Sequence, residues 1–397
     1  MELHSGRQEE VLRVVHIKKV YLPISETFVY SYLRHMTGID SHVVAERLEN
    51  ARLFPFERKH VLSLEKGFLS EYSRLVHKIT MSARTGLALL PRSPFAERIC
   101  RLIRPDVIHA HGGYDAFRYA SLKTRLGIPY VTTFYGRDAG AGSAHPYWRK
   151  AYSILFEIGD LFLVEGPAMR RKLLALGCPS AKIRVQRIGV DMGKFSLKEY
   201  GRKSDCENVV ITMCGRMVEK KGFEYGIRAF SSVHSEFPRT EMRIIGAGPR
   251  FGLIKSLISS LGLDGSVRLL GYMSHQQYAL VSRETDIFVQ PSVRASDGDS
   301  EGGAPTTLLE MQAMGIPIVS TYHDDIPDVV SEGKSAFLVR ERDPDALAER
   351  IRFLLANPQL WQRMGRKGRE QVKERHDILR LARQLESAYA ELAGLKG

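Results

Sequence analysis

Glu301, Thr306 and Glu310 bring two carboxylates and a hydroxyl together in one short stretch, SEGGAPTTLLEMQAMGIPIVST (residues 300–321). The small residues 302–304 between them leave backbone N–H groups uncovered just ahead of an expected helix. Bare amides and a positive dipole at a helix N-terminus form a site for an anion. The stretch would therefore suit a ligand with phosphate at one end and sugar hydroxyls around it.

The helix that positions these groups is predicted from the residues at its ends. Pro305 suits the first position of a helix, because its ring presets φ and its missing N–H would have no partner there. Gly315 marks the stop, so we expect a helix from about Pro305 to Met314. Thr306 and Glu310 are four residues apart and share one face of that helix. The alternative for Glu310 is an ordinary solvated helix residue.

The length of 397 residues is too great for one ordinary core and fits two domains. Hydrophobic residues at 44% and charged residues at 26% are typical of a soluble globular protein. We expect a cytoplasmic protein, because the N-terminus is polar and no apolar run of about 18 residues could span a bilayer. No Cys-x-x-Cys spacing suggests a zinc site or a disulfide framework among the cysteines, which are Cys100, Cys178, Cys206 and Cys214.

The net charge of +13 is concentrated in the first half of the chain. Residues 1–200 contain 31 Lys and Arg against 19 Asp and Glu, or +12, and the remainder contains 27 against 26, or +1. No motif that reads RNA or DNA accompanies this charge, so we expect no nucleic acid partner.

The stretch from Phe54 to Arg104 interleaves apolar and basic residues, which is typical of a surface for anionic lipid. The alternative is a solvated helical face that packs on its own domain through its apolar side. The apolar residues are Phe54, Phe56, Phe68, Leu69, Leu75, Val76 and Ile79, and the basic ones are Arg58, Lys59, Lys66, Arg74, Lys78 and Arg84.

Short apolar runs alternate with helical stretches such as 28–36 and 117–126, which predicts an α/β fold with parallel sheets flanked by helices. We expect two domains, residues 1–200 and 205–375, with a ligand cleft between facing strand ends. The tail from Asp377 to Leu395 has the pattern of one helix and is expected to pack on the first domain. The expected strands are Val11–Ile17, Val107–Ala110, Tyr130–Phe134, Leu161–Val164, Ile183–Ile188, Val209–Met213, Met242–Ile245, Val267–Leu270, Ile287–Val289, Ile316–Val319 and Phe337–Val339.

The stretch MCGRMVEKKGFEYGIRAF (residues 213–230) follows the first strand of the second domain and enters a helix. Gly215 permits a tight loop there, while Arg216, Lys220 and Lys221 gather cations where a diphosphate would bring negative charge. The later Gly-x-Gly of IIGAGPR is weak by itself, because it lacks the third glycine of a dinucleotide fingerprint.

Polar side chains also follow the strands of the first domain. In DVIHAHGGYDA, His109 and His111 share one face of a strand; a metal pair is conceivable, but no carboxylate or cysteine completes it. We expect one packing histidine, with His111 in the cleft. Tyr135 and Asp138 lie in a loop where a ligand could meet them. Glu26, in LPISETFVYSYL, either faces the cleft or serves only to cap the next helix.

The ordered motifs SETF, HAHGG, TTFYGRD, GRMVEKKGF, GAGP and EGGAPTTLLEMQAMGIPIVS resemble the retaining glycosyltransferases of family 4, above all the branch that assembles colanic acid and similar exopolysaccharides. The resemblance covers nearly the whole chain, and its last motif is highly specific. It implies the GT-B fold, in which two Rossmann-like domains face each other, with the donor nucleotide sugar on the second and the acceptor on the first. It also implies transfer that retains the anomeric configuration and needs no metal or other cofactor.

The resemblance assigns roles to individual positions. Arg216 and Lys221 look like the pair that neutralises the donor diphosphate, and Glu310 is similar to the acid that binds the ribose. Glu301 would contact hydroxyls of the donor sugar, and Tyr272 would flank the base. The remaining donor-binding positions are Gly215, Gly302, Gly303, Ala304 and Thr306, and the acceptor-side positions are Glu26, His111, Tyr135 and Asp138.

Two positions depart from the family pattern. The family's two acids are usually separated by seven residues, whereas eight lie between Glu301 and Glu310, so we expect the loop around Glu301 to bulge. The family often has histidine where this chain has Tyr135. A tyrosine donates a hydrogen bond but is no base near neutral pH.

The expected mechanism follows from where charge develops. Departure of a nucleoside diphosphate leaves charge on the β-phosphate, at which Arg216, Lys221 and the helix N-terminus are aimed in place of a metal. No second carboxylate is obviously placed as a nucleophile, so we expect front-face attack, with the leaving phosphate accepting the acceptor's proton.

The expected reaction moves a hexose from a nucleotide sugar, a UDP-sugar in preference to a GDP-sugar, to a polyprenyl-diphosphate-linked glycan. The basic first half would hold the enzyme on the anionic inner face of the plasma membrane. Two alternatives stay open. A sugar-nucleotide epimerase on the same scaffold would convert free nucleotide sugar, and a non-catalytic binding partner would bind donor without turnover.

Overall fold

The computed structural model describes residues 11–23, 26–62, 90–140, 143, 145–200 and 208–395. Most of the stretch expected to face lipid, residues 63–89, lies outside the described residues, as do Ser25 and Cys206. Cys100, Cys178 and Cys214 are free and buried. Among the described residues, no helix has the length and apolar character needed to cross a bilayer.

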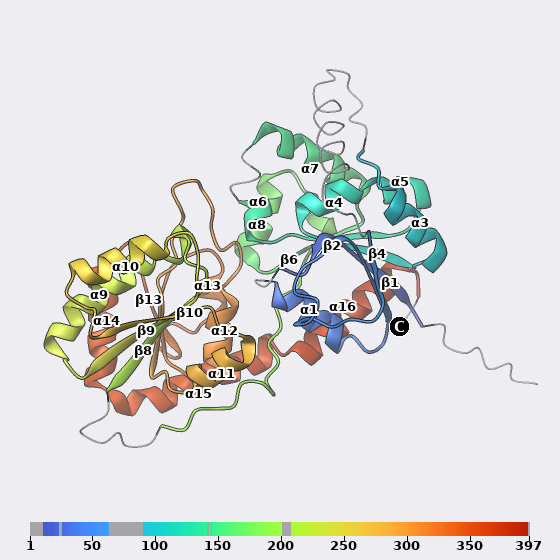
Figure 1. Ribbon diagram of the computed structural model, residues 1–397. Helices are drawn as coiled ribbons and strands as arrows, with labels where there is room; N and C mark the ends of the chain where they lie inside the picture. The colour runs from blue at the N-terminus through green and yellow to red at the C-terminus, as the bar shows by residue number, and fades with distance from the viewer. Residues whose placement is uncertain are drawn as a thin grey trace, which may run out of the picture.

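The chain forms two lobes, each built on one parallel sheet (Figure 1). The first lobe holds seven strands in the order β3-β2-β1-β4-β5-β6-β7, and the second lobe holds six in the order β10-β9-β8-β11-β12-β13. In the first lobe they are β1 (Arg13–Tyr21), β2 (Asp40–Leu48), β3 (Lys59–Val61), β4 (Val107–His111), β5 (Tyr130–Thr133), β6 (Leu161–Val164) and β7 (Ile183–Val185). In the second lobe they are β8 (Val209–Cys214), β9 (Thr240–Ile245), β10 (Val267–Gly271), β11 (Ile287–Gln290), β12 (Ile318–Thr321) and β13 (Ala336–Val339).

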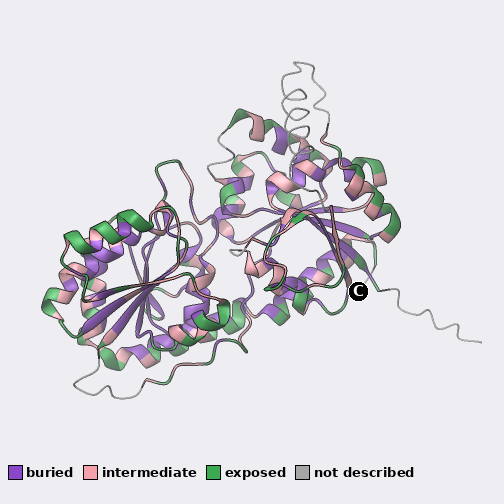
Figure 2. Cartoon of the chain, in the orientation of Figure 1, coloured by how far each residue is buried: buried purple, intermediate pink, exposed green. Residues whose placement is uncertain are grey.

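Helices cover the sheets, and the strands form the buried layer of each lobe (Figure 2). The helices of the first lobe are α1 (Thr27–His35), α3 (Pro94–Ile103), α4 (Gly113–Tyr119), α5 (Ser121–Leu126), α6 (Gly136–Ala139), α7 (Pro146–Ile158) and α8 (Pro167–Ala175), with the 3-10 turn η2 (Ser180–Lys182). The helices that follow the first lobe in the chain are η3 (Glu219–Lys221), α9 (Phe223–Glu236), α10 (Phe251–Ser260), α11 (His275–Ser282), α12 (Thr306–Ala313), α13 (Ile326–Val329), α14 (Pro344–Ala356), η4 (Pro358–Leu360), α15 (Trp361–Arg375) and α16 (Ile378–Leu392).

The strand order reverses once in each sheet, between β1 and β4 and between β8 and β11. Crevices outside the carboxyl ends of parallel strands at such reversals are the usual ligand sites of open α/β sheets. This confirms the α/β fold class expected from the sequence, and it puts the motifs that follow β4, β5, β8 and β9 at the carboxyl edges of the two sheets.

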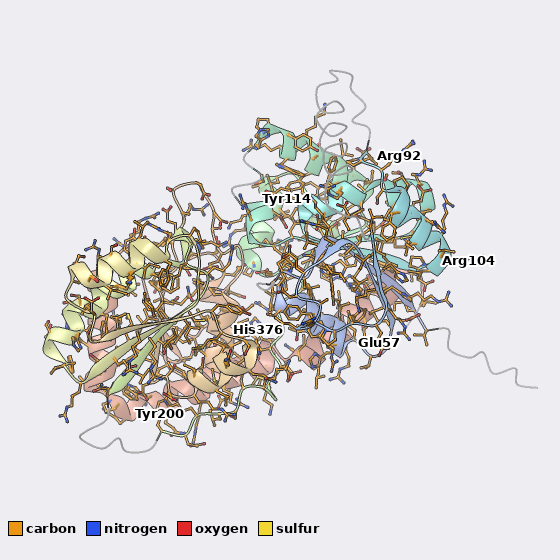
Figure 3. All side chains as sticks on the ribbon, in the orientation of Figure 1. Glu57, Arg92, Arg104, Tyr114, Tyr200 and His376 are labelled. Carbon is orange, nitrogen blue, oxygen red and sulfur yellow. The ribbon has the colours of Figure 1, made fainter. Side chains whose placement is uncertain are left out.

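The last helix returns to the first lobe, where α16 lies beside α1 (Figure 1). Its buried face, including Leu381, Leu385 and Tyr389, joins the apolar cluster of β1 and α1. Asp377 caps the helix by accepting a hydrogen bond from the N–H of Arg380 at 3.0 Å. His376, labelled in Figure 3 where the chain passes between the lobes, hydrogen-bonds the carbonyl of residue 188 at 2.9 Å.

Three local predictions need correction. The strands β2 and β3 were not expected, because polar side chains interrupt their apolar runs. The helix α12 begins at Thr306, and Pro305 is its N-cap residue rather than its first helical residue. The single helix expected over residues 117–126 is two helices, α4 and α5, that meet at Ala120.

Candidate functional site

A cleft of about 1510 Å³ lies between the lobes and is lined from both of them. Its walls include apolar and aromatic side chains of the first lobe, such as Tyr114, which Figure 3 labels on the side that faces the second lobe. Twelve of the fourteen predicted site residues line it: Glu26, His111, Tyr135, Asp138, Gly215, Arg216, Lys221, Tyr272, Glu301, Ala304, Thr306 and Glu310. Gly302 and Gly303 do not, and both are buried.

Lys221 and Glu301 form an ion pair within the cleft, with Nζ and Oε2 2.9 Å apart. Lys221 ends η3, which follows the β8 loop, while Glu301 belongs to the loop of residues 300–305 that precedes α12. Burial by itself would raise the pKa of Glu301, but the ammonium groups of Lys221 and Lys220 lower it below its ordinary value. Glu301 is therefore an ionised acid held against the cation expected to meet phosphate.

Residues that the sequence did not single out hold Glu301 in place. The hydroxyl of Ser292 donates to Oε1 at 2.8 Å, and the backbone N–H of Glu301 donates to His323 Nε2 at 3.1 Å. The other ring nitrogen of His323 pairs with Glu341 at 2.6 Å. Lys220, expected beside a diphosphate, instead donates to the carbonyl of Ser300 at 2.8 Å. No local motif marks these partners, because they come from separate parts of the second lobe.

Glu310 is buried on α12 rather than solvated, which overturns the alternative interpretation of it as an ordinary surface residue. Its Oε1 lies 3.3 Å from Nε2 of His275, the first residue of α11. His275 also lines the cleft and was missed by the sequence reasoning. The carboxylate of Glu310 therefore reaches the same cleft as the hydroxyl of Thr306, which starts α12.

Glycines allow the 300–305 loop to touch the first lobe. A β-carbon on Gly302, which has φ +83°, would lie 2.0 Å from the Cα of Gly136, and one on Gly136 would lie 2.2 Å from the carbonyl oxygen of Glu301. A β-carbon on Gly303 would lie 1.7 Å from Oε2 of Glu165. Gly302 and Gly303 therefore lie at the seam, the line along which the 300–305 loop packs against the first lobe. A side chain at either position would collide with the first lobe.

Ion pairs and helix caps fasten the same seam. Lys172 of α8 pairs with Asp324 at 2.6 Å, and Asp324 also accepts from the N–H of Gly302 at 2.6 Å. Asp325 accepts from the N–H of Ala168, near the start of α8, at 2.6 Å. The 300–305 loop is therefore braced from both lobes.

Arg216 and Tyr272 are the exposed members of the predicted donor site. Arg216 follows β8, and within the described part of the chain no carboxylate pairs with its guanidinium. Tyr272 follows β10, and its side chain is 56% exposed at the cleft. Gly215, with φ +155°, lies against the stem of Lys221, where a β-carbon would be 3.2 Å away. The exposed side chains of Arg216 and Tyr272 are therefore available to a ligand.

On the first lobe, the predicted acceptor-side residues are tied to one another. Glu26 precedes α1 but makes no side-chain cap bond; it pairs with the buried Lys18 instead. The Tyr135 hydroxyl and Nδ1 of His111 are hydrogen-bonded at 3.0 Å. Asp138 accepts from the N–H groups of Gly113 at 2.9 Å and Tyr135 at 3.3 Å, and burial raises its pKa to about 6.

His16 lies beside the expected pair of His109 and His111 and forms a cluster with them. Among the described residues, one nitrogen from each of His16, His109 and His111 lies within 4.8 Å of the others, a spacing that could hold a metal ion. Hydrogen bonds already engage five of the six ring nitrogens, and only Nε2 of His16 lacks a partner. Burial lowers the pKa of all three. The cluster is a network of neutral imidazoles that ends at the cleft in His111 and Tyr135.

Two sequence families match the two lobes in turn. Glycosyltransferase Family 4 matches residues 26–194, and Glycosyl transferases group 1 matches residues 199–371. The chain is 34% identical over 262 residues to WcaL of Escherichia coli (strain K12), named for colanic acid biosynthesis, covering 65% of this chain and 64% of WcaL. It is 33% identical over 269 residues to AmsK of Erwinia amylovora, named as an amylovoran biosynthesis glycosyltransferase, covering 67% of this chain and 65% of AmsK. The chain thus spans under two thirds of the length of these relatives.

Among solved structures, Anabaena HepE in complex with UDP and glucose has a similar fold, with a TM-score of 0.74 at 15% identity, covering 96% of this chain and 99% of HepE. The two facing Rossmann-like lobes are those of the GT-B glycosyltransferases. Residues 26–194 therefore belong to Glycosyltransferase Family 4 and residues 199–371 to Glycosyl transferases group 1.

Proposed function

We propose that the chain is a retaining, metal-independent glycosyltransferase of exopolysaccharide biosynthesis. It moves a hexose from a nucleotide sugar to a lipid-linked oligosaccharide. The observation that carries the proposal is the convergence of Arg216, Lys221 and the N-terminus of α12 on one wall of the cleft, where a diphosphate would need positive charge. WcaL and AmsK support the polysaccharide assignment, and HepE, which binds UDP, supports a UDP-sugar in preference to a GDP-sugar.

The donor diphosphate is neutralised by side chains of the second lobe. Lys221 has three N–H donors, so it can keep its bond to Glu301 and still donate to phosphate oxygens. The guanidinium of Arg216 offers a fork that suits phosphate oxygens. As the sugar–phosphate bond breaks, the charge on the leaving diphosphate grows, and these fixed cations stabilise it without a metal ion.

Each acid of the donor site holds a different part of the donor. Glu310, on α12, accepts hydrogen bonds from the ribose, and Tyr272 flanks the base. Glu301 accepts from hydroxyls of the transferred sugar, because its carboxylate is ionised and lies beside the expected phosphate cations. The hydroxyl of Thr306 and the N-terminus of α12 complete the donor site.

The first lobe orients the acceptor rather than deprotonating it. Burial lowers the pKa of His111 well below its ordinary value and raises that of Tyr135, so both are neutral and hydrogen-bonded to each other. Tyr135 therefore takes the position of the family's histidine as a hydrogen-bonding group, not as a base. The leaving phosphate accepts the proton of the acceptor hydroxyl on the same face of the sugar.

The acceptor is a polyprenyl-diphosphate-linked glycan, and the enzyme works as a peripheral protein on the inner face of the plasma membrane. The charge of +12 on residues 1–200 supports binding to anionic lipid. Cosedimentation with phosphatidylglycerol vesicles should fall as salt is raised from 50 to about 500 mM, because screening weakens such attraction. Binding that is unchanged by salt would contradict the electrostatic part of this proposal.

The reaction is tested by release of nucleoside diphosphate from a panel of UDP- and GDP-sugars, in chelator, with and without a membrane lipid extract. We expect release from one donor, raised by the extract. Conversion of the free sugar nucleotide without any effect of lipid would indicate an epimerase. Donor binding without turnover in any mixture would indicate a silent binding partner.

A further inference from the structure

Glu165 is an acidic residue of the first lobe that lines the cleft and has no role in the reaction proposed above. It directly follows β6, at the carboxyl end of the first sheet, and lines the cleft together with Lys220, Lys221 and Glu301. Its carboxyl group lies against Gly303, because a β-carbon there would be 1.7 Å from Oε2 and 2.8 Å from the Cβ of Glu165. Glu165 therefore reaches from the first lobe to the 300–305 loop of the second.

The carboxyl group of Glu165 has no bonding partner within the described ranges of the chain. Lys221, the lysine of the same wall, is paired with Glu301 at 2.9 Å. Lys220 is engaged with Asp299 at 3.3 Å and with the carbonyl of Ser300 at 2.8 Å. A half-buried carboxyl group that lines the cleft and has no such partner is available to a ligand.

The surroundings of Glu165 favour its neutral form. Burial is the main cause, and the carboxylates of Asp325 and Glu301 add to it, while the ammonium of Lys220 opposes it; together they raise the pKa of Glu165 to about 8. At pH 7 the group is an acid with an O–H donor and a carbonyl acceptor. The titratable groups that face it are Asp325, Glu301, Lys220, Asp138, Tyr32 and Tyr135.

We infer that Glu165, as a neutral carboxylic acid, hydrogen-bonds the hydroxyls of the transferred sugar of the donor from the first lobe. This inference rests on the proposed function and adds a sugar contact to it. Glu301 accepts from the sugar on the second lobe, and Glu165 supplies a donor from the first lobe, in the same cleft. A second ionised acid at that place would repel Glu301, whereas a neutral acid can bind a neutral sugar.

The contact couples recognition of the sugar to closure of the lobes. Glu165 belongs to the first lobe and the other donor-binding groups to the second, so the contact is made only where the lobes meet as they do here. The nucleoside diphosphate part of the donor depends on the second lobe alone. Glu165 should therefore distinguish a nucleotide sugar from its free nucleotide.

The test compares the binding of UDP-glucose and of UDP to the full chain by calorimetry at pH 7. Glu165→Ala should weaken UDP-glucose about tenfold, the usual effect of losing one hydrogen bond, and leave UDP unchanged within about twofold. Glu165→Gln keeps an N–H donor and should lose less. The matched control is Glu157→Gln, at an exposed position on α7.

The pH dependence of UDP-glucose binding distinguishes a hydrogen-bonding role of Glu165 from a purely structural one. Because the neutral form is present below the raised pKa, the preference of the wild type for UDP-glucose over UDP should fall as pH rises through about 8. Glu165→Gln has no proton to lose and should not show this fall. Thermal unfolding of each variant reports whether it is folded, and if the alanine variant is not, the glutamine variant carries the test.

Three outcomes would overturn the inference. Equal weakening of UDP and UDP-glucose by Glu165→Ala would show a structural role. An alkaline fall that persists in Glu165→Gln would assign the titration to another group. Loss of UDP-glucose binding in Glu165→Gln as complete as in Glu165→Ala would mean that the charged carboxylate is needed. Failure of the wild type to bind UDP, UDP-glucose, GDP and GDP-mannose alike would instead contradict the proposed function itself.

Discussion

The pair of Lys221 and Glu301 is where the chemistry of the site is most concentrated. One ammonium serves both the ionised acid beside it and, in our proposal, the leaving diphosphate. Removing one partner of such a buried pair affects both charge stabilisation in the transition state and the position of the other partner.

Lys221→Ala should lower the rate of nucleoside diphosphate release at least about 10²-fold, because it removes a fixed donor from the developing charge. Steady-state kinetics at saturating donor measure this. Lys255→Ala, at an exposed position on α10, is the matched control and should have near wild-type rates. Near wild-type turnover of Lys221→Ala would remove Lys221 from the mechanism.

Glu310→Gln should weaken UDP binding about ten- to a hundredfold, because hydrogen bonds to a charged acceptor are the stronger ones. Calorimetric titration with UDP measures the affinity without turnover, and Glu349→Gln on the exposed face of α14 is the control. An unchanged dissociation constant for UDP would show that Glu310 does not bind the ribose.

Twelve of the fourteen predicted site residues line the cleft, since most of them lie at or just after the end of a strand, or in a helix, that the pattern located. Their supporting partners were not predictable in the same way. His323 reaches the backbone of Glu301 from beyond β12, and Glu165 follows β6 in the other lobe. Such partners are set by how separate elements pack, which leaves no spacing to read in the sequence.

At the scale of elements, the 300–305 loop and α12 present Glu301, Thr306 and Glu310 to the cleft. The glycines of the loop allow the two lobes to pack closely, because Gly302 lies against Gly136 and Gly303 against Glu165. The sequence could show that the loop needed small residues but not what approached them.

Gly136→Ala should lower kcat/KM more than about tenfold while the protein stays folded. The new methyl group would lie 2.2 Å from the carbonyl oxygen of Glu301, so the loop must shift from its catalytic position. Gly252→Ala, within α10 and with open space around its added carbon, is the control and should be neutral or slightly stabilising. Unaltered kinetics in Gly136→Ala would show that the seam does not position the loop.

Strands with continuous apolar runs were predicted from the sequence, whereas β2 and β3 were missed. Both lie toward one edge of the first sheet, where half-buried polar side chains such as His42 and Glu46 replace the apolar residues of central strands. A pattern based on unbroken apolar runs detects central strands best.

At the scale of the whole molecule, α16 ties the end of the chain to the first lobe. The helix follows α15 of the second lobe, and its apolar face completes the cluster of β1 and α1. The first lobe therefore depends on α16 for part of its core.

Leu385→Ala should lower the free energy of unfolding by about 2–5 kcal/mol, because it opens a cavity where α16 packs on the first lobe. Urea unfolding followed by circular dichroism measures this. Leu379→Ala, exposed on the same helix, should change it by less than about 0.5 kcal/mol. Equal stability of the two variants would mean that α16 is only loosely attached.

The central claim is that fixed cations of the second lobe, and no metal ion, support transfer with retention. It is tested most directly by transfer from an α-linked UDP-sugar to the lipid acceptor in the presence of chelator, with the anomeric configuration of the product read by NMR. We predict an α-linked product formed at an undiminished rate in chelator. A β-linked product, or transfer that needs an added divalent cation, would contradict the account.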